Sequence, residues 1–154
     1  MADSSGTVDL LLLLAQHEEA IGRLYSSYAR RLPEQADFWN QLAADEARHG
    51  ALVGNLRARM EAGSLQFTPG RFSHQAVSGS LDHVREEIAL AESGELTPMH
   101  ALATALDLET ALIESRFFEV VEGDSKEAAE VKQSLGADTF QHRELVRAAW
   151  EKAR

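Results

Sequence analysis

The sequence predicts an all-α fold: one four-helix bundle with a long crossover connection between the second and third helices. Apolar residues recur at helical spacing along most of the 154 residues, and strand-like alternation is absent. All three prolines and most of the ten glycines fall between the periodic segments, where turns are expected. Two short turns and one long connection between four long helices give this topology.

Composition indicates a single globular domain of residues 1–154. With 44% hydrophobic residues the chain can bury a core of its own. The absence of cysteine excludes disulfides and iron–sulfur ligation, and we expect a cytoplasmic protein. The apolar run 10–14 is short and follows Asp3 and Asp9, so it does not resemble a signal peptide, and no stretch reaches transmembrane length. A net charge of −10 disfavours nucleic acid and anionic membranes as partners.

The first two helices form a hairpin. We expect helices over about 7–31 and 34–61, with Pro33 at the turn and Gly63 at the C-terminal end of the second. Their apolar stripes are Leu11, Leu14, Ile21, Tyr25 and Tyr28 in the first, and Trp39, Leu42, Val53, Leu56 and Met60 in the second.

The crossover spans about residues 62–96, where the periodicity weakens. Thr68-Pro69-Gly70 and Ser78-Gly79-Ser80 act as breakers around one short amphipathic helix, 81–91. Its segment holds more apolar residues than a lone connecting helix needs, so we expect part of it to contact a second copy in a homodimer. These residues are Val77, Leu81, Val84, Ile88 and Leu90.

The last two helices form a second hairpin. Thr97 is a good N-cap, and Pro98 suits the first position of a helix over about 97–122, which should stop near Gly123. The fourth helix covers about 125–153. Their inward residues are Leu102, Leu106, Leu112, Ile113, Phe117 and Val120, followed by Val131, Leu135, Leu145, Val146 and Ala149.

Two related pentapeptides carry the chemistry: DEARH at 45–49 and DTFQH at 138–142. Helix residues three apart share a face, so Glu46 and His49 point together into the bundle. Glu18 lies within the stripe of the first helix at a similar height. A buried carboxylate needs a partner, a proton or a metal, because an isolated buried charge costs several kcal/mol.

The second hairpin repeats this plan. Glu109 lies among leucines of the third helix, and His142 follows on the fourth at nearly the same spacing as Glu18 and His49. The two hairpins therefore look like copies of one unit, each with a glutamate on one helix and a histidine motif on the next. Thr139 stands where the second motif should repeat Glu46.

These residues resemble the ferritin-like superfamily, and within it the rubrerythrins. That family binds two irons through a glutamate from each of two helices and Glu-x-x-His from each of the other two. The stretch EEAIGRLYSSYA also resembles a rubrerythrin first helix, with Tyr25 seven residues after the ligand glutamate. Carried over residue by residue, the resemblance implies iron ligands at Glu18, Glu46, His49, Glu109 and His142.

Two positions depart from the family pattern. Thr139 replaces a bridging carboxylate, and Leu112 replaces a further glutamate, so three carboxylates and two imidazoles remain. Asp138 would partly compensate by turning inward. The resemblance also implies that Asp45 and Asp138, which precede each motif, each hydrogen-bond a ligand histidine and fix its tautomer.

The remaining candidates have plainer interpretations. Tyr25 and Tyr28 are core aromatics whose hydroxyls need a partner, and Arg116 is a partner for a buried carboxylate. If the helix phase is shifted by one residue, Glu19 or Glu114 replaces the expected ligands. The other histidines are expected in solvent: His17, His74, His83 and His100.

Three functions remain open. The first is a rubrerythrin-like non-haem iron oxidoreductase that reacts with peroxide or dioxygen and takes electrons from a separate donor protein. The second is a metal-binding or storage protein without turnover, holding iron, zinc or manganese. The third is a degenerate bundle that acts as a structural or interaction module. We expect metal to bind most strongly at Glu18, Glu46 and His49, with nearer one ion than two per chain.

Overall fold

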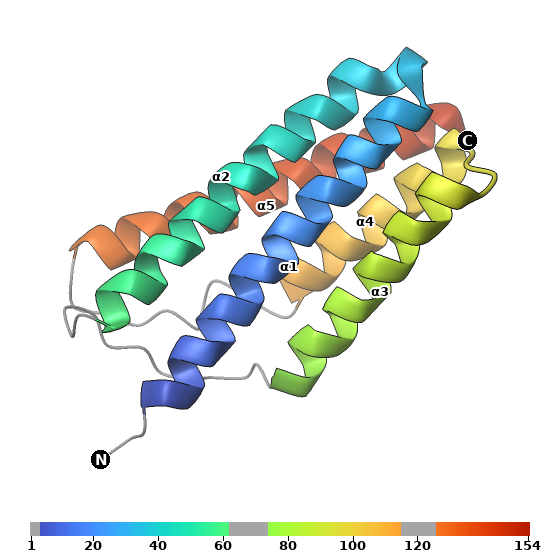
Figure 1. Ribbon diagram of the computed structural model, residues 1–154. Helices are drawn as coiled ribbons and strands as arrows, with labels where there is room; N and C mark the ends of the chain where they lie inside the picture. Colours follow the sequence, from blue (N-terminus) through green and yellow to red (C-terminus); the bar gives the residue numbers. More distant parts are fainter. Residues whose placement is uncertain (1–3, 62–73, 115–125) are drawn as a thin grey trace.

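Five α-helices make up the computed structural model, which describes residues 4–61, 74–114 and 126–154 (Figure 1). No strand occurs within these ranges, so the all-α prediction is confirmed. In chain order the elements are α1 Ser4–Arg31, the short 3-10 helix η1 Pro33–Gln35, α2 Ala36–Glu61, α3 His74–Ser93, α4 Pro98–Glu114 and α5 Lys126–Ala153.

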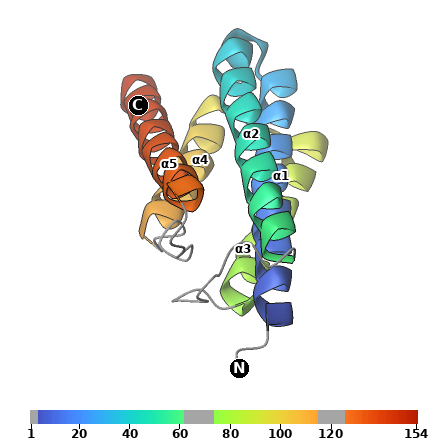
Figure 2. The same ribbon diagram turned by 90° about the vertical axis from the view of Figure 1, so that its left-hand side faces the viewer.

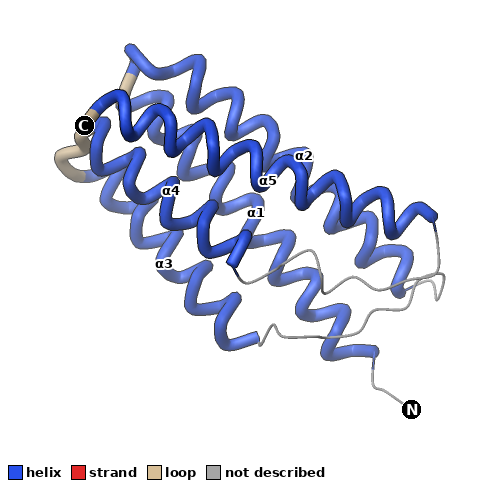
Figure 3. Tube along the Cα trace, turned by 180° about the vertical axis from the view of Figure 1, so that it is seen from behind, coloured by secondary structure: helices blue, strands red, loops and turns tan. Residues whose placement is uncertain are grey.

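The helices form two antiparallel hairpins, α1 with α2 and α4 with α5, while α3 returns the chain along α1 (Figures 1 and 3). As a result, α2 and α4 run in the same direction, as predicted for the second and third long helices. In the tight first turn the amide of Gln35 donates to the carbonyl of Leu32 at 2.9 Å. The expected stops at Gly63 and Gly123, and the side chains of Leu112 and Arg116, lie outside the described residues.

The connecting helix α3 is longer than predicted. The sequence indicated a short helix over 81–91, but α3 runs from His74 to Ser93 and passes through Ser78-Gly79-Ser80 without a break. Packing against α1 explains the difference, because tertiary contacts outweigh the roughly 1 kcal/mol that a helical glycine costs. The residues of α3 that face the core are Val77, Leu81, Val84, Ile88 and Ala91.

This packing also uses the apolar surface from which we expected a homodimer. Of the crossover residues in question, only Leu90 is exposed, and the other four are buried within the chain. The homodimer therefore stays a prediction without that argument.

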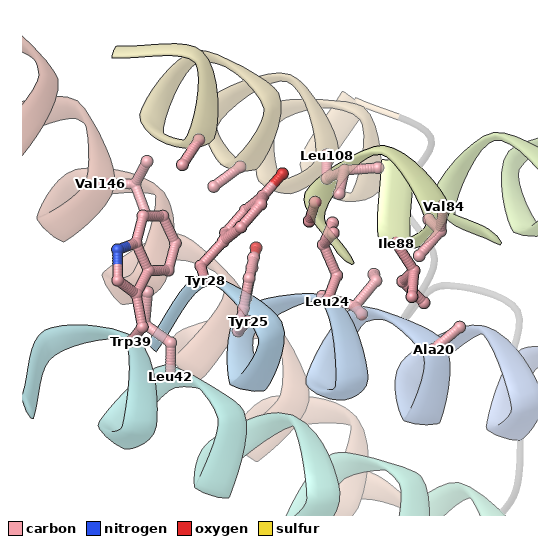
Figure 4. Packing of buried hydrophobic residues seen from close by; sticks show 14 of the residues in the cluster. Ala20, Leu24, Tyr25, Tyr28, Trp39, Leu42, Val84, Ile88, Leu108 and Val146 are labelled. Atoms are coloured by element: carbon pink, nitrogen blue, oxygen red, sulfur yellow. The ribbon is translucent and has the colours of Figure 1, made fainter. Parts of the chain in front are cut away.

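Aromatic side chains fill the end of the core next to the first turn (Figure 4). Tyr25, Tyr28 and Trp39 are fully buried, and the ring centroids of Trp39 lie 5.4 Å from Tyr25 and 4.9 Å from Tyr28. Leu145 was predicted to face inward but is exposed, because α5 turns Val146 to the core and adjacent helical residues point about 100° apart.

None of the helices in the described ranges combines the length and apolar content required to cross a bilayer.

Candidate metal centre

The two hairpins bring five ionisable side chains into the interior, each at most 3% exposed. They come from four helices: Glu18 from α1, Glu46 and His49 from α2, Glu109 from α4 and His142 from α5. These are the five ligands that the resemblance implied. The helix phase places Glu18 rather than Glu19 inside, since Glu19 is exposed, and the side chain of Glu114 lies outside the described set.

Two glycines lie where α1 and α2 meet beside the carboxylates. A Cβ atom at Gly22 would lie 3.4 Å from the Cβ of Glu46, and one at Gly50 would lie 3.8 Å from the Cβ of Glu18. No sequence pattern singled out these glycines. At both positions an added Cβ atom would make only ordinary van der Waals contacts.

In the first hairpin three donor atoms lie close together without hydrogen-bonding. The Nδ1 of His49 is 3.6 Å from Oε2 of Glu46 and 3.9 Å from Oε2 of Glu18. Metal–ligand bonds of about 2.0–2.2 Å put neighbouring ligand atoms roughly 3–3.5 Å apart, so a small inward movement would suit a shared cation.

In the second hairpin His142 faces two carboxylates. Its Nδ1 lies 3.2 Å from Oε1 of Glu46 and 3.8 Å from Oε1 of Glu109. Tyr25 fixes Glu109 by donating its hydroxyl to Oε1 at 2.8 Å. Glu46 therefore offers one oxygen to each half of the site. Donor atoms of Glu46, His49 and His142 all lie within 4.8 Å of one another, a group drawn from both hairpins.

The aspartates contact the histidines crosswise between α2 and α5. The Nε2 of His49 donates to Oδ2 of Asp138 at 3.0 Å, and the Nε2 of His142 donates to Oδ2 of Asp45 at 2.9 Å. Asp138 therefore does not turn inward as a ligand. Because each Nε2 carries the donated proton, loss of the second proton from either imidazole would leave its Nδ1 able to bind a cation on the inner side.

Burial and the closeness of the carboxylates shift the pKa values of the site. Burial and the nearby Glu46 carboxylate raise the pKa of Glu18, and the same two causes raise that of Glu109 to about 7. Burial would also raise the pKa of Glu46, but hydrogen bonds with Glu18 and His142 hold it below its usual range. Burial opposes protonation of His142, yet Glu109 and Glu46 raise its pKa to about 11. Protons thus balance the carboxylates, and a divalent cation would displace them.

One buried oxygen of each carboxylate lacks a hydrogen-bond partner among the described residues. The three atoms are Oε2 of Glu18, Oε2 of Glu46 and Oε2 of Glu109. Leaving such an atom unsatisfied costs about 1–3 kcal/mol, so three at one place require an explanation. A metal ion would satisfy them, and carboxylate with imidazole donors suit iron(II), manganese(II) and zinc(II).

Thr139 is buried on α5, one turn before His142, and contributes no charge. The second half of the site therefore has Glu109, His142 and the shared Glu46, but no carboxylate of its own from α5.

His17 was expected in solvent but is buried, so that prediction was wrong. Its Nε2 lies 2.8 Å from Oγ of Ser80 on α3, and burial lowers its pKa to about 4, so the imidazole is neutral. Because α3 covers a second face of α1, that helix has two buried sides. The spacing of Leu13, His17, Ala20 and Leu24 was the available signal.

The other described histidines follow expectation. His83 is exposed, and His100 is exposed with its Nε2 3.1 Å from Oε2 of Glu87. The side chain of His74 lies outside the described set.

Comparison with protein-family models, with curated proteins and with solved structures finds no match to this chain. The geometry of the site is therefore the guide to its chemistry.

Proposed function

We propose that this chain is a ferritin-like iron protein of rubrerythrin type, whose bound iron reacts with peroxide or dioxygen. One observation carries the proposal: three carboxylates buried at one place each keep an oxygen without a hydrogen-bond partner among the described residues, beside two histidines that turn Nδ1 toward them.

The helix arrangement supports the same family. Two antiparallel hairpins joined by a crossover, with α2 and α4 in the same direction, agree with what a ferritin-like bundle would have (Figure 2). The site takes donors from all four hairpin helices, as the metal sites of those bundles do.

The donor set favours nearer one ion than two per chain. Glu18, Glu46 and His49 provide two carboxylates and an imidazole for the first ion. A second ion would share Glu46 with the first and otherwise depend on Glu109 and His142, since Thr139 contributes no charge. Zinc or manganese fits the same donors, so the identity of the bound metal depends on which ion is available.

When bound, iron(II) supplies electrons for the reduction of peroxide or dioxygen. The residues of the chain hold the donors in place, since Asp138 and Asp45 orient His49 and His142, and Tyr25 fixes Glu109 by its hydrogen bond. Burial of the donors excludes bulk water. No cysteine in this sequence can hold a rubredoxin-type iron, so we propose a separate donor protein as the source of electrons.

Elemental analysis of protein purified without chelators tests the proposal first. We expect iron near one per chain, or uptake to that level when metal-free protein is titrated with iron(II) under anaerobic conditions. Loaded protein with a donor should then consume peroxide. Binding without consumption would favour the storage function, and protein that neither carries nor takes up metal would favour the structural module.

A further inference from the structure

Arg48 lies on the solvent side of the candidate site and contacts both aspartates that hold its histidines. Its Nη2 donates to Oδ2 of Asp138 at 2.6 Å and lies 3.6 Å from Oδ1 of Asp45. One guanidinium therefore joins the α2 and α5 sides of the site across the outer surface.

Exposure decreases stepwise from Arg48 to the interior. The side chain of Arg48 is 52% exposed, those of Asp45 and Asp138 are 24% and 22%, and the histidines behind them are almost fully buried. Polar groups thus lead without interruption from solvent to the inner carboxylates. Among the described residues, the helices that carry the site also bury apolar side chains: Leu14, Ile21, Leu42, Val53, Leu102 and Leu108.

At the level of the site, α2 and α5 are joined by polar contacts. α2 and α5 lie side by side but approach closely at only a few positions, whereas α1 and α2 pack together along their length (Figure 3). Contacts between α2 and α5 at the level of the site include the polar ones of Asp45, Asp138 and their histidines.

We propose that Arg48 is a displaceable plug, and that a divalent cation enters between α2 and α5 by replacing its guanidinium on Asp45 and Asp138. The inference rests on the proposed function, because it concerns access to that metal site. Half-exposed ion pairs contribute little stability, whereas the inner donors offer three carboxylates. A cation can therefore replace Arg48, whose side chain moves into solvent. The cation binds the two aspartates transiently and then moves on to the buried donors.

A plug affects rates more than affinity. While it is in place, Arg48 slows both entry and exit of the cation, and its positive charge repels a cation approaching along this route. A residue that only positioned the aspartates would instead change equilibrium affinity, since loosened histidines bind metal less tightly.

The test compares Arg48→Gln with Arg147→Gln in the full chain. Arg147, on α5, is 48% exposed and pairs with Glu144 at 3.0 Å, so its loss removes the same charge at similar exposure away from the aspartates. Metal-free proteins are mixed with cobalt(II) in a stopped-flow instrument and followed by visible absorbance. A chelator chase then gives the release rate, and circular dichroism verifies that each variant folds.

We expect Arg48→Gln to speed association roughly threefold or more, with faster release and little change in affinity, while Arg147→Gln matches the unchanged protein. Arg48→Lys, which keeps a positive charge, should remain close to the unchanged rate. The plug is overturned if Arg48→Gln is no faster than Arg147→Gln, if only affinity changes, or if Arg48→Lys is as fast as Arg48→Gln. If the unchanged protein binds cobalt(II) with none of these rate differences, the metal site stands and the plug does not. Absence of binding by the unchanged protein overturns both.

Discussion

Asp45 and His142 are 97 residues apart in the chain, yet their Oδ2 and Nε2 atoms lie 2.9 Å apart. This bond from α2 to α5 turns the Nδ1 of His142 toward Glu46. Asp45→Asn keeps the shape but weakens acceptance of the imidazole proton, and we expect metal affinity to fall about 10- to 100-fold. Isothermal titration calorimetry measures the metal affinity, and the Asp107→Asn variant, changed at an exposed position, is the control. Equal affinities for the two variants would contradict a role for this bond.

The two histidines should differ in importance. His49 faces both Glu18 and Glu46, the fuller donor set, so His49→Ala should abolish measurable iron binding. His142→Ala removes a donor from the half that lacks an α5 carboxylate, and should weaken binding only partly. Metal content per chain after anaerobic loading decides between them, with His100→Ala as an exposed control. If His142→Ala proves as damaging as His49→Ala, binding depends on both halves together.

Restoring the missing carboxylate should add a second ion. Thr139 is buried beside His142, so Thr139→Glu supplies a charged donor to that half. We expect iron to rise toward two per chain and peroxide turnover to increase. Phe140→Glu adds the same charge at the adjacent exposed position and should change neither. Thr139→Glu protein that folds but stays at one iron would show that the cavity cannot hold a second ion.

Metal should stabilise the folded chain. The buried carboxylates bind the ion only when the helices assemble them, so at 100 times the dissociation constant the gain is about 2.7 kcal/mol. For a chain of this size that corresponds to a rise in Tm of roughly 5–10 °C. Differential scanning calorimetry with manganese(II), which avoids oxidation, measures it. His49→Ala should show no such rise, and a rise in that variant would place the bound ion elsewhere.

The solvent face of α3 offers a prediction on stability alone. A Cβ atom at Gly79 would meet no atom within 4 Å, so Gly79→Ala should fit and stabilise the chain by about 0.5–1 kcal/mol through helix propensity. Urea denaturation followed by circular dichroism measures the change. Ser78→Ala, at the preceding exposed position, should give a smaller gain because serine is the better helix former of the two native residues. A destabilised Gly79→Ala protein would argue against a continuous α3.

Local patterns predicted the helices and the residues at the centre, because both depend on periodicity. The apolar stripe of α1 indicated that Glu18 faces inward, and its burial agrees. The full length of α3 was not predictable in the same way, since Ser78-Gly79-Ser80 is locally a poor helix former and only packing on α1 compensates. The burial of His17 was not predicted for the same reason. The sequence pattern indicated one apolar face on α1, but packing of α3 buries a second face.

The crosswise contacts between the aspartates and the histidines were not predictable for a different reason. Spacing indicated that Asp45 and Asp138 could hold histidines, but which histidine each one reaches depends on the height and rotation of α2 relative to α5. The contacts of Arg48 were not predictable either, because an exposed arginine in a helix is common. Its position becomes informative only once the structure places two aspartates from different helices beside it.

The grouping of the helices has a consequence for how the chain opens. α1, α2 and α3 pack as one unit and α4 with α5 as another, so the candidate site lies on the boundary between two parts (Figure 2). Any cooperative opening that separates these parts would dismantle the site while leaving each part's own helix contacts in place. Such an opening breaks side-chain contacts between α2 and α5 but not the backbone hydrogen bonds inside either helix, so a bound ion would hold the two parts together without changing the contacts within each part.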